Sequence, residues 1–91
     1  MIRSEDFPTL VEFMRKCLFQ EAAPTFEGAI RAWTINGDEA VRSVVREIDR
    51  LLSEHRSPSE LDDFIDRNSD YGEEGGGHAA LEYINRILKE S

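Results

Sequence analysis

The sequence predicts an all-α fold, a compact bundle of about five short helices, and three observations carry this prediction. Apolar residues recur at the three- and four-residue spacing of a helix in most segments, and no segment shows the alternation of a strand. Proline and glycine clusters separate these segments at short intervals. The chain has 91 residues, 40% of them apolar and 33% charged, which suits one globular domain spanning residues 1–91.

The first helix is expected over residues 8–19. Pro8 suits a first helical turn, where the missing N–H costs nothing; a capping box of Thr9 and Glu12 is the alternative start. After Pro24 a second, shorter helical stripe follows. The apolar positions of the two stripes are Leu10, Val11, Phe13, Met14, Cys17 and Leu18, then Phe26, Ala29, Ile30 and Trp33.

The third predicted helix is the longest and follows a turn at Asn36–Asp38. Its opposite face mixes acids and bases, and Asp38 and Arg42 form an acid-first pair four residues apart. Its apolar face is continuous and consists of Ala40, Val41, Val44, Val45, Ile48, Leu51, Leu52 and His55. This helix is expected to be the spine of the bundle.

Ser57–Glu60 is the clearest start signal of a helix in the chain. The Ser57 hydroxyl can accept from the Glu60 amide, Pro58 fits the first helical position, and Glu60 can return a bond. This fourth helix is expected to run to about Arg67 and to bury Leu61, Phe64 and Ile65.

A glycine-rich loop over residues 68–77 precedes the last helix. This helix is expected to start near His78. It buries Ala80, Leu81, Ile84, Ile87 and Leu88.

Composition limits the classes of partner and compartment. The net charge of −8 argues against direct nucleic-acid binding, which needs a basic face, and favours a basic protein partner. The single Cys17 excludes a disulfide framework and fits a reducing compartment. No apolar run approaches the roughly 20 residues that span a bilayer, and the first residues lack the apolar stretch of a signal peptide. We therefore expect a soluble, cytoplasmic protein.

Most of the negative charge is concentrated in residues 57–74. This stretch holds seven acids against one base and so contributes −6 of the net −8. Two interpretations stay open: a solvated face that keeps a small domain soluble, or an acidic docking face for a basic protein. Tyr71, an aromatic residue ringed by acids, is a candidate anchor of such an interface. The candidate partner-binding residues are Asp62, Asp63, Asp66, Asp70, Tyr71, Glu73 and Glu74.

No residue pattern supports catalysis or a cofactor. Residues 66–77 resemble a calcium loop, but Tyr71 and Gly77 stand where the loop needs glycine and glutamate. His55 and His78 lie far apart in the sequence, and neither a metal pair nor an activated Cys17 is indicated. No nucleophile elbow, P-loop or dinucleotide fingerprint occurs. We expect no enzyme activity, no cofactor and no bound metal.

The order of motifs resembles the small helical immunity proteins of bacterial contact-dependent growth inhibition systems. The resemblance covers most of the chain. It is carried by an opening Phe-Pro-x-Leu segment, the core of the long helix, a serine-capped start and an Asp-Tyr-Gly loop, found here at 7–14, 47–52, 57–61 and 70–72.

The resemblance implies a function. Such a protein binds the toxic C-terminal domain of a growth-inhibition effector in the cytoplasm and neutralises it without catalysis. Many of these toxins are nucleases, whose clefts are basic because they hold phosphates. Two alternatives stay open: a small acidic carrier of acyl-carrier type, although Ser57, Ser59 and Ser69 lack the usual context of the modified serine, and a calcium-responsive module. The identity of the toxin and the oligomeric state are open.

Overall fold

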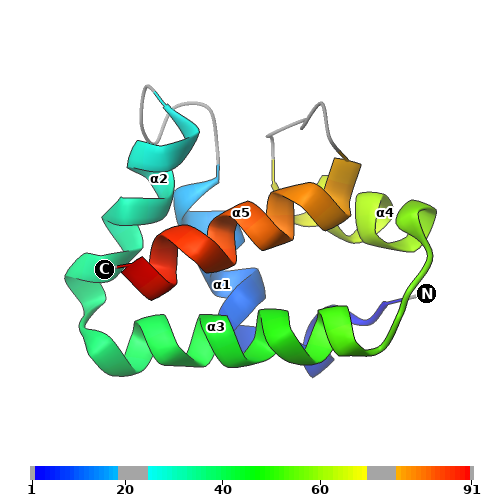
Figure 1. The fold of residues 1–91 in the computed structure, drawn as a ribbon, viewed down its shortest axis with the longest axis horizontal. Helices are drawn as coiled ribbons and strands as arrows, with labels where there is room; N and C mark the ends of the chain where they lie inside the picture. Colours follow the sequence, from blue (N-terminus) through cyan, green and yellow to red (C-terminus); the bar gives the residue numbers. More distant parts are fainter. Residues whose placement is uncertain (1, 19–24, 70–75, 91) are drawn as a thin grey trace.

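The described part of the chain forms five α-helices and two short 3₁₀ helices in the computed structural model (Figure 1). The structure describes residues 2–18, 25–69 and 76–90. None of these residues lies in a strand, so the predicted all-α bundle is confirmed. The helices, in chain order, are η1 (Ser4–Asp6), α1 (Pro8–Cys17), α2 (Phe26–Ala32), η2 (Trp33–Asn36), α3 (Asp38–Ser53), α4 (Pro58–Asn68) and α5 (Gly76–Glu90).

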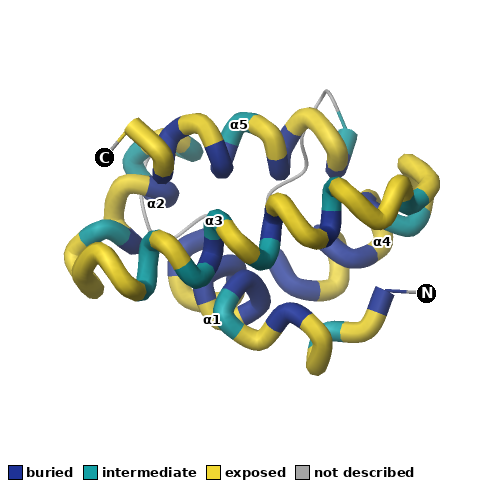
Figure 2. Tube along the Cα trace, turned by 60° about the horizontal axis from the view of Figure 1, so that its bottom comes forward, coloured by how far each residue is buried: buried dark blue, intermediate teal, exposed yellow. Residues whose placement is uncertain are grey.

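The helices form two sides around one core. α5 packs against α2, α3 and α4, while α1 packs against α3 and α4. α2 and α4 lie at opposite ends of the long dimension of the molecule, which measures 31 Å (Figure 1). Along each helix, buried positions alternate with exposed ones at helical spacing (Figure 2), as the apolar stripes predict.

The core contains most of the apolar residues that the stripes assign to it, while Phe26 of the second stripe is half-buried and packs against the core. The structure buries all the described apolar residues that the sequence predicts for the first, fourth and last helices. Two edge-to-face aromatic pairs join distant segments: Phe7 with Phe64, at 6.0 Å between ring centroids, and Phe13 with Trp33, at 5.7 Å. The Trp33 indole N–H donates to the carbonyl of Ala40 at 3.1 Å, which satisfies the one polar group of this buried ring.

The third helix differs from its predicted form at its C-terminal end. It ends at Ser53, so His55 lies outside it and is exposed rather than part of the apolar face. Val44, Ile48 and Leu51 are buried as expected, and the other apolar positions of this helix are half-buried (Ala40, Val41, Val45 and Leu52). Because only one edge of α3 faces α1 and α5, the stripe is wider than the surface that covers it.

Three further helix boundaries differ from the predicted ones. α4 includes Asn68, whose buried side chain donates to the carbonyl of Phe64 at 2.8 Å and accepts from Arg15 at 3.3 Å. α5 begins at Gly76 rather than near His78, so the loop between α4 and α5 is shorter than predicted. α1 ends at Cys17, so Leu18, predicted to belong to the first helix, lies outside it; Phe19 lies outside the described residues.

The buried side-chain amide of Asn85, between α3 and α5, has a hydrogen-bond partner in the described part of the chain for only one of its two polar atoms. Asn85 is 7% exposed; its Nδ2 donates to the Asp49 carboxylate at 2.7 Å, while its Oδ1 has no partner among the described residues. A buried acceptor without a partner costs about 1–3 kcal/mol. We expect Asn85→Leu to raise the free energy of unfolding by about 1 kcal/mol in urea denaturation, with Asp49→Ala as the control for the lost bond. A large destabilisation by Asn85→Leu would instead indicate a buried water at Oδ1.

Candidate functional site

The exposed side of α4 carries the described part of the acidic stretch. The Ser57 hydroxyl accepts from the Glu60 amide at 3.3 Å, and Pro58 occupies the first turn, so the predicted helix start is confirmed. In the predicted capping box, the Glu60 carboxylate accepts from the Ser57 amide. In the structure it instead accepts from the Arg56 side chain at 3.2 Å. With this start, Leu61, Phe64 and Ile65 turn inward and are buried.

Asp62, Asp63 and Asp66 therefore share the outer side of α4. All three are exposed, and their spacing places them within one sector of the helix. Figure 2 shows this outer side of α4 at the surface, at the end of the molecule opposite to α2. The structure brings these three predicted site residues together, and we call them the α4 acidic face.

The three carboxylates have different partners. Asp62 accepts a hydrogen bond from the backbone amide of Gly77 and so caps the first turn of α5. Asp63 forms an ion pair with Arg67 at 2.9 Å. No ion pair or hydrogen bond joins Asp66 to another described residue. Asp66 is thus the carboxylate most available to a partner, while Asp62 has a structural task that the sequence did not reveal.

Arg67 ties the acidic face to the N-terminal segment. Its Nη2 donates to the carbonyl of Ile2 at 2.8 Å, and its guanidinium lies 6.0 Å from the centre of the Phe64 ring. Ile2 is itself buried, at 1% exposure. The one base of the acidic stretch is therefore held in place by the fold, and Asp63 remains beside it.

The other four candidate residues are not described by the structure. Asp70, Tyr71, Glu73 and Glu74 lie outside the described residues, as does half of the calcium-like loop. The prediction that they extend the acidic face stays a prediction. Within the described ranges, no group of three or more His, Cys, Asp or Glu side chains is arranged to hold a metal ion.

Cys17 is buried on the inner side of α1, as its stripe predicts. Burial raises the pKa of its thiol above the ordinary value, with a smaller opposing effect of the Lys16 charge. A raised pKa leaves less thiolate at neutral pH, which is the property of a structural cysteine.

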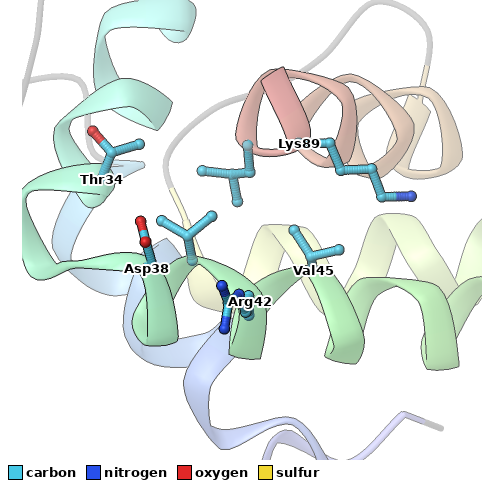
Figure 3. A pocket seen from close by; sticks show the side chains of 7 residues that line it. Thr34, Asp38, Arg42, Val45 and Lys89 are labelled. Atoms are coloured by element: carbon cyan, nitrogen blue, oxygen red, sulfur yellow. The ribbon is translucent and has the colours of Figure 1, made fainter. Parts of the chain in front are cut away.

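A shallow cavity of about 330 Å³ lies between the start of α3 and the end of α5 (Figure 3). Val41, Val45 and Leu88 form its apolar part, and charged side chains lie around them. Asp38 and Arg42, predicted to pair with each other, both line this cavity without an ion pair between them. Ile35, which follows the cavity residue Thr34, is 89% exposed and is therefore not part of the core.

A second cavity, of about 270 Å³, lies where α3 ends and α5 begins. It is lined by both histidines of the chain, together with Leu51, Leu52, Arg56 and Leu61. No local pattern predicts that His55 and His78 line one cavity, because 22 intervening residues and the whole of α4 separate them. Only the packing of α5 against α3 and α4 brings them to one place.

The described helices include none with the length and apolar character that crossing a membrane requires. Comparisons of the chain with protein-family models, with curated proteins and with solved structures return no match.

Proposed function

We propose that this protein is an immunity protein that binds the toxic C-terminal domain of a contact-dependent growth inhibition effector and neutralises it by stoichiometric binding. The observation that carries the proposal is the α4 acidic face: Asp62, Asp63 and Asp66 lie exposed on one side of one helix. The resemblance of the motif order to small helical immunity proteins gives the class of partner.

The charge distribution supports a basic partner. A stretch of 18 residues, 57–74, contributes −6 of the net −8. Three of its described carboxylates, those of Asp62, Asp63 and Asp66, are exposed together on α4, while Glu60 is half-buried. A nuclease toxin must carry a basic cleft to hold phosphates, and an acidic protein surface complements the same potential. Complementary charge of this kind mainly accelerates encounter and rejects wrong partners.

The direct test is capture of the toxin. The C-terminal domain encoded by the neighbouring effector gene is co-expressed with this protein, and the expected result is a 1:1 complex in size-exclusion chromatography and protection of growth. If the domain remains toxic and elutes separately, or if no large secreted effector is encoded beside this gene, the proposed function is wrong.

Charge changes on the α4 acidic face should slow association with the toxin domain. We expect Asp63→Asn with Asp66→Lys to reduce the association rate constant about tenfold at low ionic strength, because steering depends on local charge. The difference should shrink at about 1 M salt, where the Debye length is about 3 Å. Asp62 is left unchanged, because it caps α5. Surface plasmon resonance at several salt concentrations measures both effects.

The matched control carries the same change of net charge elsewhere. Glu39→Lys with Glu90→Gln alters exposed acids on α3 and α5, away from α4. This control should bind the toxin domain nearly as fast as the unmodified protein. Equal rates for the two double variants would show that the α4 acidic face is not the docking surface.

A further inference from the structure

The cavity between the end of α3 and the start of α5 has a defined chemistry. Leu51 and Leu61, at 0% and 2% exposure, and the half-buried Leu52 supply its apolar floor. His55, Arg56 and His78 supply planar, nitrogen-bearing walls. At about 270 Å³ it is large enough to receive one bulky side chain but too small for a larger ligand.

His55 occupies a backbone position that favours glycine. Its φ of 53° is the only positive φ of a non-glycine residue among the described residues. The residue follows directly after the last turn of α3, and its amide donates to the carbonyl of Leu52 at 3.3 Å. Helices commonly end with glycine in this left-handed conformation, because a Cβ is disfavoured there. The chain instead keeps an imidazole at this position, and that imidazole lines the cavity.

The polar walls are surrounded by carboxylates. Arg56 is held by Glu54 at 3.0 Å and by Glu60 at 3.2 Å, and the Nδ1 of His78 lies 2.8 Å from the Glu82 carboxylate. No side-chain hydrogen bond or ion pair joins His55 to another described residue. Glu54, Glu60 and Glu82 therefore lie beside the polar lining of the cavity and give it a negative rim.

The cavity adjoins the α4 acidic face. The Asp62 carboxylate accepts a hydrogen bond from the backbone amide of Gly77, which directly precedes His78 in the lining of the cavity. A partner that docks on the α4 acidic face is therefore close to the cavity at Asp62.

We propose that this cavity is the anchor pocket for an aromatic side chain, flanked by basic residues, of the same partner that docks on the α4 acidic face. An aromatic ring can stack on the imidazoles and lie against the Arg56 guanidinium. The basic neighbours of that ring meet Glu54, Glu60 and Glu82 at the rim. A buried aromatic anchor surrounded by weaker polar contacts is the usual arrangement of an interface hot spot. The inference rests on the proposed function for the identity of the partner, but not for the chemistry of the pocket.

A short peptide tests the pocket without the toxin. The probe is acetyl-Arg-Trp-Arg-amide, titrated while the ring protons of His55 and His78 are followed by NMR. We expect saturable shifts of both rings, with acetyl-Arg-Ala-Arg-amide and acetyl-Glu-Trp-Glu-amide each binding at least about fivefold more weakly, because one lacks the ring and the other the charge. Absent shifts, or equal shifts with the alanine peptide, would overturn the proposal.

His55→Gly separates binding from folding. Because glycine suits the backbone of residue 55, this variant should fold and melt a few degrees higher than the unmodified protein. It should nevertheless bind the tryptophan peptide at least about fivefold more weakly. Asparagine tolerates the same backbone conformation but has no aromatic ring. His55→Asn should therefore lose as much affinity for the tryptophan peptide as His55→Gly does. Unchanged affinity in both variants would exclude a role of the imidazole in an anchor pocket.

The toxin domain then distinguishes the two proposals. If the domain binds the unmodified protein and His55→Gly equally, the anchor pocket is wrong while the proposed function stands. If the domain does not bind the unmodified protein at all, the proposed function is wrong. The peptide titration then decides by itself whether the cavity is an anchor pocket for an aromatic side chain.

Discussion

Gly77→Ala is expected to lower the free energy of unfolding by about 2 kcal/mol, although alanine is the better helix former. Gly77 is buried in the first turn of α5, where that turn crosses the backbone of α4. A Cβ built on it would lie 2.8 Å from the Leu61 carbonyl carbon and 2.9 Å from the Asp62 amide nitrogen. Because these atoms belong to the main chain, the neighbouring helix must move to make room.

Two opposing effects decide this result. Helix propensity favours alanine by about 1 kcal/mol, and overpacking typically costs about 1–3 kcal/mol or more. The steric effect should prevail, since displacing α5 also strains the bond from the Gly77 amide to Asp62. Shortening the Leu61 side chain should not relieve the clash, because that side chain is not part of it.

Urea denaturation followed by circular dichroism measures the effect of Gly77→Ala. The control is Ala79→Leu, an exposed position in the same turn, which should change the free energy of unfolding by less than about 0.5 kcal/mol. If Gly77→Ala stabilised the protein, as helix propensity alone requires, α5 would not approach α4 as closely as the structure has it.

Glu47→Ala is expected to cost about 2 kcal/mol, because it removes the cap of a different helix. α1 begins after Phe7, which provides no side-chain cap. Instead, the Glu47 carboxylate on α3 accepts from the amide of Leu10 at 2.8 Å and from that of Thr9 at 3.3 Å. A carboxylate at a helix N-terminus also interacts favourably with the helix dipole.

Glu47→Gln tests how much of the capping effect depends on the negative charge of Glu47. The amide keeps one acceptor oxygen but loses the charge, so we expect about half of the cost of Glu47→Ala. Glu12→Ala is the matched control on α1 itself: Glu12 is exposed and pairs only with Lys16 among the described residues, at 2.8 Å, so stability should hardly change. Equal effects of Glu12→Ala and Glu47→Ala would contradict the assignment of the cap to Glu47.

The stabilising contacts of α1 and α5 could not be predicted from local patterns. For α1, the sequence offers Pro8 or a capping box of Thr9 and Glu12 as its start; the structure begins the helix at Pro8 and caps it with Glu47, 37 residues beyond Leu10. For α5, the cap is Asp62, a residue that the charge pattern assigns only to an exposed acidic face, either solvated or docking. The Ser57 cap of α4, by contrast, depends only on residues three apart and was predicted.

The candidate site also has one part that local patterns predict and another part that depends on contacts between distant segments. That Asp62, Asp63 and Asp66 lie opposite to Leu61, Phe64 and Ile65 follows from the helical period of one segment and was predicted correctly. Which of these carboxylates is available depends on Gly77 and Arg67, and the meeting of His55 with His78 depends on how α5 crosses the end of α3. Neither has a sequence signal.

By itself, the sequence determined the helical class, the apolar stripes and the exposed acids of α4, because each of these depends on spacings of three or four residues along one helix. Only the tertiary structure decided which acids cap a neighbouring helix, where His55 and His78 meet and why Gly77 cannot carry a side chain. Those features arise where helices far apart in the chain touch, and a contact of that kind leaves no periodic trace in the residues that make it.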